Sequence, residues 1–210
     1  MNLPKIILLM VINVSYSLPK SIEIKGKEYK ITNDGDYRMV IDCFRVLNDC
    51  ELSQPFRIIT ALMIFYVDFN SVDDVNNLSK TDYQKLVEKM FDFFNAGQTV
   101  TGTQSHYKLI DWDKDEQLIC AAVNNVAKTE IRSLEYLHWY TFLGNYMSIG
   151  DSVLSMVVSI RDKIVHKKKL EKYELKFRKD NPNYFNWEMR TAEEIEEEQE
   201  FLRKWKSGSL

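Results

Sequence analysis

Apolar residues recur every three to four positions along most of the chain, which is the spacing of amphipathic helices. Residues that favour helix starts precede these stretches: Asp36, Pro55 at a first helical position, Ser79, Asp113 with Glu116 as a capping box, Ser133 and Asp151. The pattern predicts helices over about 36–48, 55–66, 79–97, 118–126 behind the capping box at 113–116, 133–147 and from 151 past 164. The stretch after Ser133 is apolar on nearly all sides, so we expect its helix to be central to the core. In the last helix, the residues expected to face inward are Val153, Val157, Ile160 and Ile164.

Residues 21–31 follow a different pattern, in which apolar and polar residues alternate on both sides of Lys25-Gly26. Alternation around a short turn predicts a small β-hairpin. Seven glycines and four prolines among 210 residues are too few for a turn-rich β-sandwich or barrel. The sequence therefore predicts a mainly α protein. It has a single helical domain over 18–180 that begins with the hairpin, and a charged, helical C-terminal tail over 181–210.

Residues 1–17 form an apolar leader, in which Lys5 precedes a mostly apolar run over 6–14. The run is too short to span a membrane as a helix. Because Ser15-Tyr16-Ser17 fits a small-x-small cleavage site, a secretory signal is one interpretation. The other is a leader that packs on the body of the protein or on a partner. Three cysteines without a CxxC pair favour reduced thiols in a cytoplasm, and so the second interpretation.

Two charged segments follow one another near the carboxy terminus. Residues 161–179 hold nine Lys or Arg against three acids, and residues 188–200 hold seven Glu against one Arg. The aromatic residues Tyr173 and Phe177 within the basic run are compatible with nucleic-acid binding. A solvated basic helix that pairs with the acidic tail explains the same pattern, and we favour it because the net charge of the chain is −3.

The sequence contains no motif typical of an enzyme. The three histidines are scattered, and His138 is expected to be a hydrogen-bonded core or subunit-contact residue. Asp111, Asp113 and Asp115 resemble the start of a calcium loop, but helix capping explains them better because the glycine of that loop is missing. No Ser or Cys lies in a nucleophile motif. We therefore expect a non-enzymatic protein without a cofactor or metal.

Three stretches together resemble one known family, the bacteriophage gene-product-fifteen proteins of siphophages that infect Gram-positive bacteria. The first is LPKSIEIKGKEYKI over 18–31, followed by Tyr37-Arg38. The second is ALMIFY over 61–66, with FFNAG over 93–97. The third and most specific combines DEQLICAA over 115–122, IRSLEYLHWYTF over 131–142 and VVSIRDK over 157–163. The resemblance covers roughly 18–187, and Tyr140 stands where the family often has a second adjacent Trp.

The resemblance implies a small, mostly helical phage morphogenesis protein encoded near the tape measure gene. Such proteins look like tail assembly chaperones, which coat the tape measure protein until tail tube subunits displace them. The implied partner is thus the tape measure protein, bound by several copies or a homo-oligomer in the host bacterial cytoplasm, and neither nucleic acid nor a membrane. The mature virion is expected to lack the protein. The alternative is a structural tail or head–tail component that stays in the virion.

The sequence does not identify which residues bind such a partner. Aromatic residues on the predicted helices are the candidates: Tyr136, Trp139, Tyr140, Tyr173 and Phe177.

Overall fold

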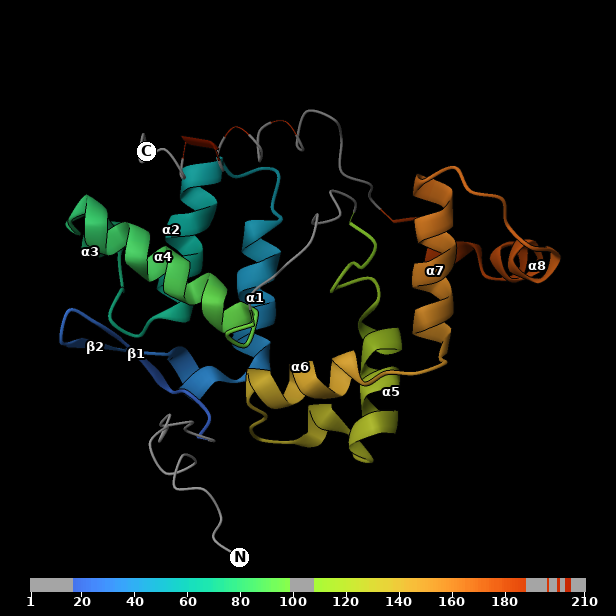
Figure 1. Ribbon diagram of the computed structural model, residues 1–210, viewed down its shortest axis with the longest axis horizontal. Coiled ribbons are helices and arrows are strands. Elements are labelled where there is room, and N and C mark those ends of the chain that lie inside the picture. Colours follow the sequence, from blue (N-terminus) through green and yellow to red (C-terminus); the bar gives the residue numbers. More distant parts are fainter. Residues whose placement is uncertain (1–16, 99–107, 188–195, 197–199, 201–202, 205–210) are drawn as a thin grey trace, which may run out of the picture.

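The structure, a computed structural model, describes residues 17–98, 108–187, 196, 200 and 203–204 (Figure 1). Its helices are α1 (Tyr37–Leu47), α2 (Gln54–Phe65), α3 (Val72–Asn76), α4 (Lys80–Phe94), α5 (Glu116–Ala127), α6 (Trp139–Met147), α7 (Val153–Val165) and α8 (Lys172–Asp180). The remaining elements are the strands β1 (Ser21–Ile24) and β2 (Lys27–Lys30) and the 3-10 turns η2 (Thr32–Gly35), η3 (Ile131–Ser133) and η4 (Pro182–Phe185). The predicted mainly α fold with a small N-terminal hairpin is confirmed.

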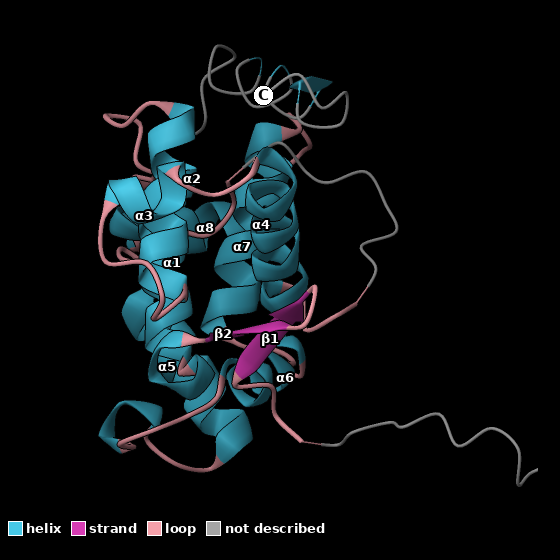
Figure 2. Cartoon of the chain, turned by 90° about the vertical axis from the view of Figure 1, so that its left-hand side faces the viewer, coloured by secondary structure: helices cyan, strands magenta, loops and turns pink. Residues whose placement is uncertain are grey.

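The hairpin forms where the alternating pattern predicts it. β1 and β2 pair antiparallel, from Ser21 opposite Lys30 to Ile24 opposite Lys27. Lys25 and Gly26 both have positive φ, at 52° and 79°, as a two-residue turn of this kind requires. The apolar face of the hairpin, which includes the buried Ile24 and Tyr29, covers one end of α4 (Figure 2).

Helices α1 and α2 pack against each other, and α4 crosses α2 (Figure 1). Aromatic rings fill the space between these helices and α6: Phe44, Phe65, Phe93, Phe94, Trp139 and Phe142. The indole of Trp139 is only 2% exposed, and its Nε1 donates a hydrogen bond to the Phe94 carbonyl over 2.9 Å. The expectation that the aromatic segment around Trp139 is central to the core is therefore correct for this face of α6.

The predicted start of that helix at Ser133 is wrong. Ser133 ends η3, and α6 begins only at Trp139, with His138 at its N-cap. The intervening chain is held away from helical geometry by α1, because the Leu137 N–H donates to the Asp36 carboxylate over 2.9 Å. The Tyr37 N–H donates in turn to the Leu137 carbonyl over 2.9 Å. A long-range pairing thus overrides the local helical pattern.

Two further helix starts differ from the prediction. The capping box of Asp113 and Glu116 is absent: α5 begins at Glu116, and the N-cap position is Asp115, whose side chain makes no capping bond. For α7, the cap is Ser152 rather than Asp151, in a capping box with Ser155. Val153 was expected to face inward but is 48% exposed, because the buried stripe of α7 begins at Leu154 and continues through Val157 and Ile160.

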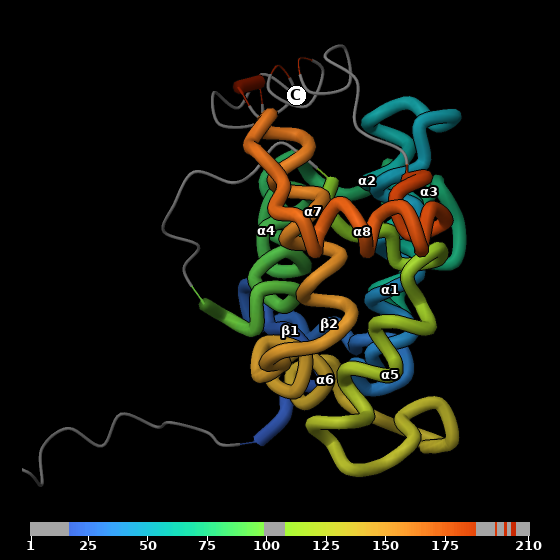
Figure 3. The backbone as a smooth tube through the Cα atoms, turned by 90° about the vertical axis from the view of Figure 1, so that its right-hand side faces the viewer, coloured from blue at the N-terminus to red at the C-terminus, as the bar shows by residue number. Residues whose placement is uncertain are grey.

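Helices α7 and α8 form an arm at the edge of the molecule (Figure 3). The helix packed against α7 is α5, and α8 has its main contacts with the short η4 turn. The inward side of α7 is formed by Leu154, Val157, Ile160 and Arg161, all buried. In α8, by contrast, the buried residue is Glu174. The outer surface of the arm is therefore open to other molecules.

Parts of two predictions lie outside the described residues. The polar residues and glycines over 97–110 predict a loop, which is described only at its ends, where it is non-helical. Thr191 with Glu194 predicts a second capping box, at the start of a helix in the acidic tail, but both residues lie outside the described part of the chain. Glu200 and Lys204 in that tail are helical and form an ion pair of 2.8 Å, which agrees with a helical tail at these positions.

Candidate partner-binding surfaces

The five aromatic candidates do not form one site. Tyr136 lies beside the hairpin, Trp139 and Tyr140 are on α6, and Tyr173 and Phe177 are on α8. Tyr136 and Tyr173 are exposed, at 42% and 61%, whereas Tyr140 and Phe177 are half-buried. Trp139 is buried in the aromatic core, so its ring offers no surface to a partner in the folded chain.

Tyr136 lines a groove of about 690 Å³ between the polar face of the hairpin and the η2 turn. Its hydroxyl donates to the Asp34 carbonyl over 3.0 Å, and the ammonium of Lys20 lies 6.0 Å from its ring. Lys20 also forms an ion pair of 2.7 Å with Asp34. Basic and acidic groups alternate around this groove, so it favours neither an acidic nor a basic partner.

His138 is held as a neutral imidazole behind this groove. Its Nδ1 accepts the Tyr140 N–H over 3.0 Å and so caps α6, and its Nε2 lies 3.0 Å from the Pro19 carbonyl and donates to it. Burial lowers the pKa of His138 below its ordinary value, because the charged form loses hydration. Protonation at Nδ1 also removes the acceptor that caps α6. The expectation of a hydrogen-bonded core histidine is confirmed.

The low pKa predicts that the protein loses stability in mild acid. The unfolded chain binds a proton at His138 near pH 6.5, whereas the folded chain does so only at lower pH. The stabilisation is therefore complete above about pH 6.5 and falls as the pH drops below it. Urea unfolding at pH 7.5 and 5.5 should show a smaller pH difference for His138→Asn than for the wild type. His166→Asn, at an exposed position, is the control; an equal change in both variants contradicts the assignment.

Large apolar side chains are exposed mainly on and near the arm. Among the described residues, ten large apolar side chains are exposed, and five of them fall between residues 147 and 175. Three of them lie at the junction of α6 and α7, and we call this exposed apolar set the α7 ridge: Met147 at the end of α6, and Val153 and Met156 in the first turns of α7, at 65%, 48% and 36% exposed. The exposed positions of α7 next to them are Ser155 and Ser159, which carry no charge. The α7 ridge is thus suited to an apolar contact.

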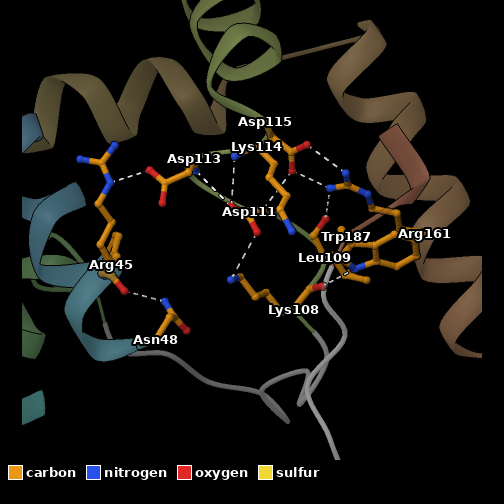
Figure 4. A network of polar contacts seen from close by, with 11 residues as sticks. Arg45, Asn48, Lys108, Leu109, Asp111, Asp113, Lys114, Asp115, Arg161 and Trp187 are labelled. Atoms are coloured by element: carbon orange, nitrogen blue, oxygen red, sulfur yellow. Dashed lines mark hydrogen bonds and ion pairs between the residues drawn. The ribbon is translucent and has the colours of Figure 1, made fainter. Parts of the chain in front are cut away.

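The arm is joined to the body through a buried arginine, Arg161 (Figure 4). Its guanidinium makes a bidentate ion pair with Asp115 at 2.5 and 2.9 Å. It also donates to the Leu109 carbonyl over 2.9 Å and, through both Nε and Nη2, to the Tyr184 carbonyl over 3.0 and 2.5 Å. All five N–H groups of the guanidinium therefore have acceptors, which offsets the cost of burying the charge.

The same junction holds the segment that follows α8. The indole Nε1 of Trp187 donates to the Lys108 carbonyl over 2.9 Å, and the guanidinium carbon of Arg161 lies 4.9 Å from the indole ring. Arg161 thus connects α7, the segment before α5 and the segment after η4. Counting it in a solvated basic run was an error, since its side chain is 1% exposed.

The sequence contained a sign of this role. Arg161 falls four residues after Val157 and seven after Leu154, so it continues the buried stripe of α7. An arginine at an inward position requires a buried acid. This acid is Asp115, one of the three aspartates that were interpreted as helix caps, since its carboxylate binds Arg161. Asp111 instead accepts the backbone N–H groups of Asp113 and Lys114 over 3.1 Å each. Of the three aspartates, only Asp111 therefore accepts the backbone N–H groups that a capping role requires.

Taken together, the fold and these surfaces define a helical protein with an aromatic core and a projecting arm that exposes apolar and basic side chains. A family model described as "Bacteriophage Gp15 protein" matches residues 14–185. The chain belongs to this family and is a phage-related protein. Comparisons with curated proteins and with solved structures gave no match. Within the described residues, no helix is both long enough and apolar enough to cross a membrane.

Proposed function

We propose that this phage protein is a tail assembly chaperone that binds the tape measure protein and keeps it soluble during tail assembly. The family membership is the observation that carries the proposal. A tape measure protein is a long helical, partly apolar chain, and such a chain aggregates unless its apolar surface is covered. The chaperone role is non-enzymatic, takes place in the host cytoplasm and leaves the finished virion without this protein.

The α7 ridge supports the proposal as a client-binding surface. Met147, Val153 and Met156 are all exposed within ten residues of chain, and two of them are flexible methionines. Methionine surfaces adapt to apolar partners of different shape, which suits a client that is bound at many positions along its length. Val153 and Met156 are three residues apart on one helix face, so they can pack against an amphipathic helix.

Co-expression with the tape measure protein tests the proposal. The client should stay soluble and co-purify with several copies of this protein, at low salt and at about 0.5 M salt, where charges are screened beyond ~4 Å. The variant Met147→Ser/Val153→Ser/Met156→Ser should lose the client. The matched control, Leu18→Ser/Phe56→Ser/Phe91→Ser, removes three exposed apolar side chains elsewhere and should retain it.

Other results of this experiment contradict the proposal in different ways. If no complex forms at low salt and none forms at high salt, the chaperone function is ruled out. A complex that is lost only at high salt shows that the basic run over 161–179 binds the client instead of the α7 ridge. Mass spectrometry of purified virions distinguishes the alternative, because a structural tail or head–tail component stays in the particle and a chaperone does not.

A further inference from the structure

The outer face of α8 exposes both apolar and basic side chains. Leu175 is 52% exposed and Tyr173 is 61% exposed. Lys172 and Lys179 lie three residues before and four residues after Leu175, so they flank it on the same helix face. The opposite face holds the buried Glu174, whose carboxylate pairs with Lys163 over 2.6 Å and so fixes α8 to α7.

Several cations on and near this face form no ion pair with any residue that the structure describes. Within the described part of the chain, no ion pair involves Lys172, Arg178 or Lys179, nor Lys167 or Lys169 just before α8. Lys176 is the exception on α8, with an ion pair of 3.3 Å to Asp180. A helix with unpaired cations around an exposed leucine is complementary to an acidic segment that also carries apolar residues.

The same chain contains such a segment. Residues 188–200 hold seven Glu and one Arg, a net charge of −6. Ile195, Glu198 and Leu202 are spaced by three and four residues, so at helical spacing they share one face. The tail thus offers apolar residues bordered by carboxylates, which matches the arrangement on α8.

The route of the chain directs this tail away from the α8 of its own molecule. After α8, the chain returns past α7 and is anchored by Trp187 at the Lys108 carbonyl. The described positions of the tail, red in Figure 1, lie at the end of the molecule marked C, well away from α8, which lies beyond α7 at the other edge. At those positions Glu200 pairs with Lys204 of its own segment.

We infer that the acidic tail over 188–202 of one molecule docks on the outer face of α8 of a second molecule. Such a contact joins two different surfaces, so each molecule keeps one free tail and one free α8 and further copies can add head to tail. Open-ended growth suits a protein that covers a long client in many copies. The inference concerns the chain alone and does not depend on the identity of the client.

Sedimentation of the full-length chain over a range of concentrations tests the inference without any client. The wild type should form oligomers larger than dimers at low salt and dissociate as salt rises. The α8 variant, Lys172→Glu/Leu175→Glu/Lys179→Glu, should associate at least ~10-fold more weakly. The control, Lys27→Glu/Phe56→Glu/Lys85→Glu, makes the same charge change elsewhere on the surface and should associate like the wild type.

A mixing experiment separates contact between molecules from contact within one. The tail variant, Glu194→Lys/Glu197→Lys/Glu198→Lys, should also associate weakly by itself. An equal mixture of the tail variant and the α8 variant should regain oligomers, because each supplies the surface that complements the other. A monomeric wild type at all concentrations overturns the inference. So does a mixture that stays monomeric, or an α8 variant that associates as strongly as the wild type.

Discussion

Replacing Arg161 by methionine should destabilise the protein by about 3–5 kcal/mol, because it leaves the carboxylate of Asp115 buried without its counter-ion. The loss also removes the donors that satisfy the carbonyls of Leu109 and Tyr184. Both side chains of the ion pair are almost fully buried, at 1% and 2% exposed, so solvent cannot replace the guanidinium. Urea unfolding followed by circular dichroism measures the change in the free energy of unfolding.

Two further variants make this result specific. The double variant Arg161→Met/Asp115→Leu should be less destabilised than the sum of the two single variants, because no charge remains buried. Arg132→Met is the matched control: this arginine is 39% exposed and pairs with Glu130 at the surface, so its loss should destabilise the protein far less than the loss of Arg161. Equal effects of Arg161→Met and Arg132→Met refute the buried junction.

The junction also connects stability to the proposed function. Since Arg161 holds α7 against the segment before α5, its loss should loosen the arm that carries the α7 ridge and α8. A variant that remains folded at low temperature is therefore expected to bind both the client and a second copy less well, although neither contact includes Arg161.

Replacing Trp139 by alanine should also cost about 3–5 kcal/mol, the usual loss for deleting a large buried aromatic side chain. Trp139 packs against the rings of Phe44 and Phe142, with ring centroids 5.7 and 5.5 Å away, and donates to the Phe94 carbonyl. The change removes contacts of α6 with both α1 and α4. Such a loss is a large fraction of the stability of an ordinary domain. Thermal unfolding should show a much lower melting temperature or an insoluble chain.

Tyr140→Ala serves as the comparison, because Tyr140 is the adjacent aromatic residue and is only half-buried. We expect a smaller loss of stability in that variant. A soluble Trp139→Ala protein with an unchanged melting temperature contradicts the burial of Trp139 and restores it as a candidate for contact with the client.

Local sequence determined the positions of the hairpin and of most helices, because their signals lie within a few residues. Lys25-Gly26 supplies the positive φ angles that the turn needs. Asp36 caps α1 by accepting the Arg38 N–H over 2.9 Å, and Ser79 caps α4 in the same way through Asp82. Such interactions form between neighbours in the chain, so pattern and propensity were enough to predict them.

The tertiary structure alone decided where the long-range polar groups pair. Leu137 is non-helical because its N–H bonds to Asp36, 101 residues earlier, and the Asp115 side chain binds Arg161, 46 residues later, instead of capping α5. No local pattern contains these partners, and yet desolvation makes them obligatory once the groups are buried. Burial also removed Trp139 from the possible surface and placed Tyr173 on it. The charges of α8 were visible in the sequence, but which of them form no ion pair within the described residues became known only from the folded chain.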